Sequence, residues 1–112
     1  MSEGKALRYN EGKLDWTLLD FDSIAPAVKV MTFGATKYAR ENWKLPCDDP
    51  KQHIQSAIRH LLAITKGEEV DPESGERHSG HVICNMMMYN FHTGDVKTKP
   101  IVKHPELPFK YI

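Results

Sequence analysis

Apolar side chains recur every three or four residues in three segments of the chain, which is the spacing of an amphipathic helix. The first segment begins at Asp22 or Ser23, either of which can cap a helix, and runs toward Tyr38. Pro26 would then fall in the first turn, where proline is tolerated, and Gly34 interrupts the segment near its end. The pattern therefore predicts a helix with a clear start signal, and Gly34 leaves open whether it continues unbroken to Tyr38.

A second helix is predicted after Asp49 and Pro50, because an aspartate cap followed by a proline is typical of a helix start. Gly67 is a plausible stop signal for this helix. Its apolar stripe consists of Ile54, Ala57, Ile58, Leu61, Leu62 and Thr65. The remaining positions are mostly polar, so this helix is expected to bury one face only.

A third helix is predicted from Ser74 or Gly75 to about Phe91, with Gly94 at its end. Apolar residues cover almost every direction around it, which is typical of a helix that is buried on all sides. Such burial in so small a domain needs a partner subunit, so we expect a homo-oligomer, either a dimer or a tetramer.

The two ends of the chain lack helical periodicity. Residues 1–21 are expected to form an extended arm or loop, and residues 96–112, which carry three prolines, a second extended arm. The whole chain, residues 1–112, is therefore expected to be a single all-α domain of three to four helices with extended terminal arms.

The composition narrows the range of partners. The chain has 112 residues with 15 basic and 15 acidic side chains, so it has no net charge to attract a nucleic-acid polymer. It contains no apolar run long enough to span a membrane and no secretory signal at its start. Cys47 and Cys84 are too few for a disulfide framework. We expect a cytoplasmic protein whose ligands are small molecules.

The segment EEVDPESGERHSGHVICN, residues 68–85, carries the densest candidate chemistry. On an ideal helix, His78, His81 and Asn85 fall within an arc of about 60° and therefore face one place. Glu69 and Asp71 lie just upstream, so a site that holds a metal with carboxylates and imidazoles is chemically sensible. The alternative is purely structural, since acidic residues favour a helix start and histidines often satisfy internal hydrogen bonds.

The second helix adds two candidates. His60 lies beside the apolar stripe and can approach the third helix if the two helices pack antiparallel. Arg59 carries a guanidinium suited to a phosphate or a carboxylate. An arginine on a helix is also often simply solvated, so this assignment depends on where the third helix lies.

Positive and aromatic side chains gather in the segment FGATKYARENWK, residues 33–44. Aromatic faces stack on nucleobases and cationic groups hold phosphates, so the combination of Lys37 with Tyr38 and Trp43 suits a nucleotide. Lys13 and Trp16 repeat the pairing in the N-terminal arm. In both places the aromatic side chains can equally serve to fix the end of an element to the core.

Some familiar catalytic motifs are absent from the sequence. Both GK dipeptides lack the upstream glycine and the following serine or threonine of a phosphate-binding loop. No His-Asp dipeptide occurs, which disfavours phosphohydrolases built on paired His-Asp ligands. Neither cysteine has a histidine arrangement that specifies a nucleophile.

Three pieces, FGATKY with Asn42 and Trp43, RHLLA, and GEEVDPESGERHSGH with Asn85, together resemble a known family. They are similar to the N-terminal domain of phage and bacterial dATP/dGTP diphosphohydrolases, over roughly residues 8–92. That domain resembles in fold the MazG-like all-α nucleotide pyrophosphohydrolases. The resemblance implies a MazG-like helical bundle that is oligomeric and handles purine nucleotides.

MazG-like enzymes hold magnesium or manganese with acidic side chains on neighbouring helices and break the α–β phosphate bond. The first helix here carries no carboxylate between Ile24 and Tyr38, and Thr32 stands where a glutamate is expected in relatives. His78 and His81 stand where a Glu-x-x-Asp pair is expected. Fewer carboxylates should weaken the binding of a hard cation and leave a nucleotide pocket intact.

Three functions remain open. One is a hydrolase that uses Mg or Mn to convert deoxypurine triphosphates to monophosphate and pyrophosphate, with Glu69, Asp71, His78 and His81 as metal ligands. A second is a phage nucleotide sponge, which needs no metal and sequesters a cyclic or ADP-ribose-type defence signal. A third is a structural oligomer. The ligand-binding candidates are Lys13, Trp16, Lys37, Tyr38, Asn42, Trp43, Arg59, His60 and Asn85.

Overall fold

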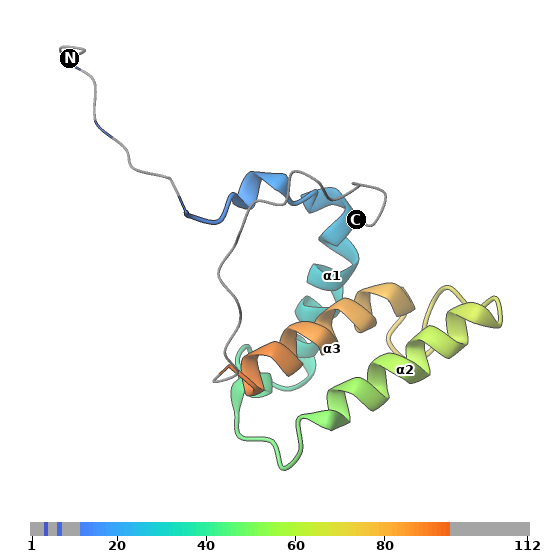
Figure 1. Cartoon of the computed structure of the whole chain (residues 1–112). Coiled ribbons are helices and arrows are strands. Elements are labelled where there is room, and N and C mark those ends of the chain that lie inside the picture. Colours follow the sequence, from blue (N-terminus) through green and yellow to red (C-terminus); the bar gives the residue numbers. More distant parts are fainter. Residues whose placement is uncertain (1–3, 5–6, 8–11, 95–112) are drawn as a thin grey trace, which may run out of the picture.

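The computed structural model describes residues 4, 7 and 12–94, and this part of the chain is helical (Figure 1). Its elements are η1 (Trp16–Leu18), α1 (Phe21–Lys37), η2 (Asn42–Lys44), α2 (Lys51–Thr65) and α3 (His78–His92), where η marks a short 3-10 helix. Within the described residues, the β pairing is limited to an isolated bridge between Val70 and Arg77. For the described residues, the prediction of an all-α fold with three to four helices is confirmed, with α1, α2 and α3 as the main helices.

Helix α3 is the central element of the fold. It packs against α2 along one side and against α1 along another. The connection over residues 66–77 reverses the chain, so that α2 and α3 run antiparallel (Figure 1). The buried core is small and consists of Ala27, Val30, Ala57 and Cys84, with Met31 and Met88 packed at its edge. The antiparallel arrangement of α2 and α3 brings His60 to the third helix, as the sequence predicted.

Helix α1 begins at Phe21, one or two residues earlier than expected, with Asp20 at the cap position. The Ser23 hydroxyl donates to the Asp20 carboxylate, so Ser23 lies inside the first turn. As a result, Pro26 falls in the second turn rather than the first. Gly34 does not break the helix, since the Tyr38 N–H still donates to the Gly34 carbonyl.

The crossing of α1 and α3 is close because Gly80 has no side chain. A Cβ atom at Gly80 would lie 2.4 Å from the carbonyl oxygen of Pro26. One turn further along α3, the Cys84 thiol donates to the carbonyl of Ala27 at 3.1 Å. Backbone packing and this buried hydrogen bond together fix how α1 lies across α3.

Helix α2 starts as predicted, with the Asp49 carboxylate accepting a hydrogen bond from the Lys51 N–H at 3.0 Å. After Thr65 the chain turns at Gly67, whose φ of +91° lies in the region that favours glycine. The predicted start and stop signals of this helix are both confirmed.

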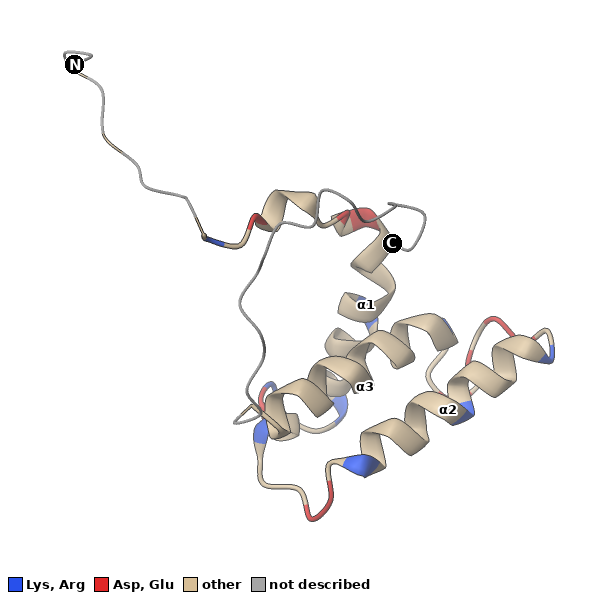
Figure 2. Ribbon diagram, in the orientation of Figure 1, with Lys and Arg blue, Asp and Glu red and all other residues tan. Residues whose placement is uncertain are grey.

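Helix α3 begins at His78, so the predicted start at Ser74 or Gly75 is wrong. The preceding residues fold into a closed loop, in which the Asp71 N–H donates to the Glu76 carbonyl and Gly75 adopts a φ of +74°. The backbone N–H groups of Asp71 and Gly75 thus donate to carbonyls within the loop, and the helix begins only after it. Figure 2 shows that acidic positions concentrate in this connection between α2 and α3.

Burial of α3 on all sides does not occur within this single chain. Ile83, Met87 and Phe91 share one face of α3 and are 37%, 40% and 48% exposed. The N-terminal arm contains the short helix η1 and is therefore not extended throughout. The predicted C-terminal arm, residues 96–112, lies outside the described residues. No described helix is long and apolar enough to cross a membrane.

Candidate functional site

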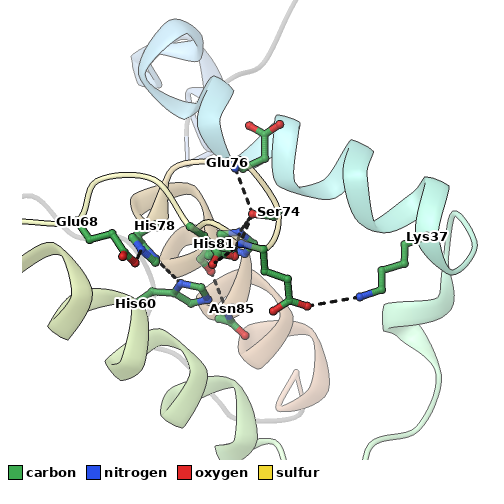
Figure 3. A network of polar contacts seen from close by, with 10 residues as sticks. Lys37, His60, Glu68, Ser74, Glu76, His78, His81 and Asn85 are labelled. Atoms are coloured by element: carbon green, nitrogen blue, oxygen red, sulfur yellow. Dashed lines mark hydrogen bonds and ion pairs between the residues drawn. The ribbon is translucent and has the colours of Figure 1, made fainter.

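The loop between α2 and α3 places a carboxylate and a hydroxyl beside His81. The Ser74 hydroxyl donates to Asp71 Oδ2 at 3.0 Å and lies 2.7 Å from His81 Nε2 (Figure 3). Since the Ser74 proton goes to Asp71, the hydroxyl oxygen accepts from His81 Nε2–H. The neutral ring of His81 is therefore left with a lone pair on Nδ1.

A second chain of hydrogen bonds runs from Glu68 through two histidines. Glu68 Oε1 lies 2.7 Å from His78 Nε2, and His78 Nδ1 lies 2.8 Å from His60 Nδ1 (Figure 3). A carboxylate only accepts, so His78 Nε2 carries the proton, and its Nδ1 must accept from His60 Nδ1–H. This relay leaves His60 Nε2 with a free lone pair.

The two chains meet where the rings of His60 and His81 stack. Their centroids are 4.4 Å apart and their planes differ by 4°. Burial lowers the pKa of both histidines below the ordinary value of 6.5, and the neighbouring histidines lower it further. For His81 the nearby Asp71 carboxylate partly offsets this decrease. Both rings are therefore neutral near pH 7 and can accept a proton or bind a metal.

Asp71 keeps its charge inside this site. Burial acts to raise the pKa of Asp71, but the hydrogen bonds donated by the Glu73 N–H and by Ser74, together with His81, outweigh it and lower the pKa below 3.8. The side chain of Asp71 is only 18% exposed. A mostly buried, ionised carboxylate thus lies 3.5 Å from His81 Nε2.

A polar cavity of about 680 Å³ lies between α2, α3 and the loop of residues 66–77, called the acidic loop below. Asp71, Ser74 and the three histidines of these chains line it, and His53, Phe33 and Tyr38 line it as well. Arg59 and Asn85 also line it, and the Arg59 guanidinium is held at 2.9 Å by the Ser56 hydroxyl. The Asn85 Nδ2 donates to the backbone carbonyl of His81 at 2.8 Å. The cavity therefore combines a guanidinium, an ionised carboxylate and neutral imidazoles.

An apolar pocket of about 310 Å³ adjoins this cavity. It is formed by the second half of α1 and by η2, with Met88 from α3. Phe33, Tyr38 and His81 line both hollows, so the two share a wall. Lys37 lines the apolar pocket and Glu73 lines the polar cavity, and the Lys37 ammonium lies 3.7 Å from the Glu73 carboxylate (Figure 3).

Most of the ligand-binding candidates lie around these two hollows. Lys37, Tyr38, Asn42 and Trp43 line the apolar pocket, whereas Arg59, His60 and Asn85 line the polar cavity. Lys13 and Trp16 do not join them, because they line a separate hollow formed by residues 13–19. The acidic loop, the histidine-bearing helix and the Lys37-Tyr38 segment thus line two adjoining hollows.

The four predicted metal ligands do not converge on one point. Asp71 and His81 are neighbours, but His78 is bonded to Glu68 and His60, and Glu69 lies outside the cavity, 3.6 Å from Arg77. Glu68, one of the carboxylates just upstream of the third helix, was not among the four predicted ligands. Nothing in the pair Glu68-Glu69 indicates which carboxylate turns inward, since that depends on the path of the loop.

Comparison with known proteins agrees with the motifs. A 27% identical relative over 82 residues is the dATP/dGTP diphosphohydrolase of Salmonella phage PMBT28; the match covers 72% of this chain and 27% of that protein. The chain therefore spans about a quarter of the length of this curated relative. No solved structure matches the chain. The family model described as "dATP/dGTP diphosphohydrolase, N-terminal" matches residues 3–97, and the chain belongs to this family.

Proposed function

We propose that this chain binds a deoxypurine nucleoside triphosphate across the two hollows and hydrolyses it to monophosphate and pyrophosphate. The observation that carries the proposal is the shared wall of Phe33, Tyr38 and His81 between an apolar pocket and a polar cavity. A nucleotide has the same division, with an aromatic base at one end and phosphates at the other. The activity named for the phage relative supports the choice of substrate.

The base is assigned to the apolar pocket. Tyr38 and Trp43 offer aromatic faces there, and Asn42 offers an amide that can hydrogen-bond the edge of a purine. The phosphates are assigned to the polar cavity, where Arg59 presents a fork of donors suited to phosphate oxygens. Lys37 stands near the junction and can exchange its ion pair with Glu73 for one with phosphate.

His60 is the best-placed general base. Its Nε2 lone pair is free, and the proton on its Nδ1 is held by the relay through His78 to the Glu68 carboxylate. When Nε2 takes a proton from water, that carboxylate stabilises the imidazolium. The water oxygen then bonds to the α-phosphorus, the bond from this phosphorus to the α–β bridging oxygen breaks, and pyrophosphate leaves.

A divalent cation would be held by Asp71 and by His81 through its free Nδ1, with phosphate oxygens completing the coordination. Bound there, Mn²⁺ or Mg²⁺ would supply neutralisation of the charge that develops on the phosphates. An ionised carboxylate beside a neutral imidazole suits manganese better than magnesium, which prefers oxygen ligands alone. Glu69 and His78 are not part of this smaller set, because their side chains are engaged elsewhere.

A nucleotide sponge is the second candidate. It is favoured by one observation, the failure of the predicted metal ligands to converge within a single chain. In this alternative the same two hollows capture an intact nucleotide, such as a cyclic or ADP-ribose-type defence signal, in the cytoplasm of a bacterial host. No bond is broken and no metal is needed.

The exposed face of α3 is assigned to a second copy of the chain. Ile83, Met87 and Phe91 form a continuous apolar stripe at a spacing of four residues, and in an isolated chain this stripe faces water. Pairing two such stripes in a dimer, or four in a tetramer, would bury α3 on its remaining side. Native mass spectrometry checks this, and Met87→Glu should convert the oligomer to monomers.

One experiment separates hydrolase from sponge. The pure full-length chain is incubated with dATP or dGTP, with Mn²⁺ or with a chelator, and products and bound nucleotide are both measured. Release of monophosphate and pyrophosphate that needs Mn²⁺ supports the hydrolase, and His60→Gln should lower that rate by roughly 10²–10⁴-fold. Retention of intact nucleotide with chelator present and no turnover supports the sponge. The absence of both binding and turnover would refute the proposal.

A further inference from the structure

We propose that Cys47, His53 and His92 form a binding site for a thiophilic divalent cation of the zinc class, with ligands different from those proposed in the nucleotide site; of the three, His53 also lines the polar cavity. One potential ligand atom from each of the three side chains lies within 4.8 Å of the others, and all three side chains are partly buried. Among the described residues, this is the cluster of three metal-ligating groups that meets that distance. None of the three was a candidate in the sequence.

The hydrogen bond of His92 prepares its ring for a metal. His92 Nε2 lies 2.8 Å from the backbone carbonyl oxygen of Trp43, which can only accept, so this nitrogen carries the proton. Nδ1 is then the nitrogen with a free lone pair. Metal-binding histidines usually donate their other N–H to a carbonyl or carboxylate in this way, which fixes the ring and its tautomer.

His53 is prepared in the same manner by Asn85. The Asn85 Nδ2 donates to the backbone carbonyl of His81, so its Oδ1 is the atom that faces His53 Nδ1 at 3.2 Å. This oxygen accepts the His53 Nδ1–H and leaves Nε2 free for a metal. The His53 and His92 rings stack with centroids 5.6 Å apart and planes 10° from parallel. Two oriented imidazoles therefore stand together beside the Cys47 thiol.

The ligand set selects the kind of cation. Two imidazoles and one thiolate are the ligands of zinc and cobalt, whereas magnesium and calcium need oxygen donors. Three protein ligands leave the fourth tetrahedral position for water or another donor. The nucleotide site offers Asp71, His60 and His81 but no cysteine, so the two sites should differ in which metals they prefer.

The position of the site in the chain suggests a structural role. Cys47 lies in the loop after η2, His53 in the first turn of α2, and His92 in the last turn of α3. A shared cation would fix this loop to both helices, at the end of the α2–α3 pair opposite the acidic loop. Metal binding at such a junction stabilises the folded chain, because the ligands are not assembled in the unfolded state.

Cobalt provides a direct test on the full-length chain after removal of metals with a chelator. We expect one Co²⁺ per chain in this site, with tetrahedral d–d bands and a thiolate-to-cobalt charge-transfer band, and loss of both sets of bands when Zn²⁺ displaces the cobalt. Cys47→Ser should abolish the charge-transfer band although Cys84 is still present, and His92→Gln should weaken binding. His81→Gln should leave the band intact, because His81 belongs to the nucleotide site.

Two measurements keep the test decisive if a variant folds poorly. In the wild-type chain, Zn²⁺ should slow alkylation of Cys47 and raise the unfolding temperature, and a chelator should reverse both effects. Three results would each overturn the proposal: no cobalt uptake, uptake without a charge-transfer band, or a band that survives Cys47→Ser. An alkylation rate of Cys47 that does not respond to Zn²⁺ would overturn it as well. None of these results depends on whether the chain hydrolyses nucleotides.

Discussion

The backbone of Gly80 in α3 lies directly against the backbone of Pro26 in α1, so closely that a Cβ atom added at Gly80 would be 2.4 Å from the Pro26 carbonyl oxygen. Backbone atoms cannot rotate away as a flexible side chain does. The helices would have to separate to admit even one methyl group, and separation would strain the hydrogen bond from the Cys84 thiol to Ala27. The α1–α3 crossing therefore requires glycine at position 80.

Gly80→Ala should lower the free energy of unfolding by about 1–3 kcal/mol, the usual cost of overpacking a tight contact. Gly34 is the matched control, because it also lies in a helix but a Cβ atom added there would have nothing within 4 Å. Gly34→Ala should raise the free energy of unfolding by about 0.5–1 kcal/mol. Urea denaturation measures both, and equal effects of the two substitutions would contradict the close contact.

The two cysteines should differ in reactivity toward alkylating reagents. Burial raises the pKa of Cys84 to about 11, so almost none of this thiol is ionised near neutral pH, and its side chain is also shielded from solvent. Cys47 is only partly buried. Mass spectrometry of the metal-free native chain treated with iodoacetamide should show one modified cysteine, Cys47, and denaturant should expose the second. Rapid native modification of Cys84 would contradict the packing of α1 on α3.

Stability should decrease as the pH falls from neutral through 6.5. The pKa values of His60 and His81 lie below 6.5 in the folded chain, so the unfolded chain takes up protons first as the pH passes through 6.5. The decrease should level off once the folded histidines are protonated as well. Asp71 affects stability at lower pH. Its pKa in the folded chain is below 3.8, so its contribution to stability is lost only as the pH falls through that lowered value.

Urea midpoints measured across this range check the pH dependence, and His60→Gln should make the decline near pH 6.5 shallower. A midpoint that rises as the pH falls through 6.5 would mean that the folded histidines are protonated more easily than the unfolded ones. That result would contradict the burial of the His60–His81 pair.

Glu68→Gln tests the relay behind the proposed general base. Removing the carboxylate destabilises the His60 imidazolium, so kcat should fall by about 10- to 100-fold, within what a positioned base contributes. The acidic limb of the kcat/KM profile should also move to lower pH, which a merely structural role would not cause. Glu69→Gln is the control, because Glu69 pairs with Arg77 outside the cavity. Equal losses from both substitutions would argue against the relay.

Tyr38 tests the assignment of the base to the apolar pocket. Tyr38→Ala should weaken nucleotide binding by about 1–3 kcal/mol, the usual value of one stacked base, whereas Tyr38→Phe should retain most of the affinity. Trp16→Ala is a suitable control, since Trp16 lines the separate hollow in the N-terminal arm. Calorimetric titration with dATP or a slowly hydrolysed analogue measures all three. A loss of affinity in Trp16→Ala as large as in Tyr38→Ala would remove the distinction between the two hollows.

The helices were predictable because periodicity is a local property of the sequence. Asp49 and Gly67 bound α2 as expected, since a cap and a turn depend only on neighbouring residues. The start of α3 was not predictable in this way. Ser74 has the chemistry of a cap, yet its hydroxyl bonds to Asp71 and His81 instead, because the loop closes on itself before the helix begins.

The sequence indicated which way the histidines of α3 face, but not which side chains they bond to. Helical spacing places His78 and His81 toward one region, and the structure brings both to the cavity. Helical spacing alone does not indicate that His60 of α2 would bond to His78, because this hydrogen bond joins two different helices. In an extended segment successive side chains point to opposite sides, so the reach of Glu68 toward His78 turns Glu69 outward.

The bridge between Val70 and Arg77 closes the acidic loop at its base, and the His78 N–H adds a hydrogen bond to the Glu69 carbonyl at 2.9 Å. The chain thus leaves and re-enters the helical body at adjacent points. Insertions or deletions between those two points would change the reach and charge of the loop without shifting either helix. Family members can therefore vary the charge and shape of the polar cavity through this segment, while the scaffold beneath it stays the same.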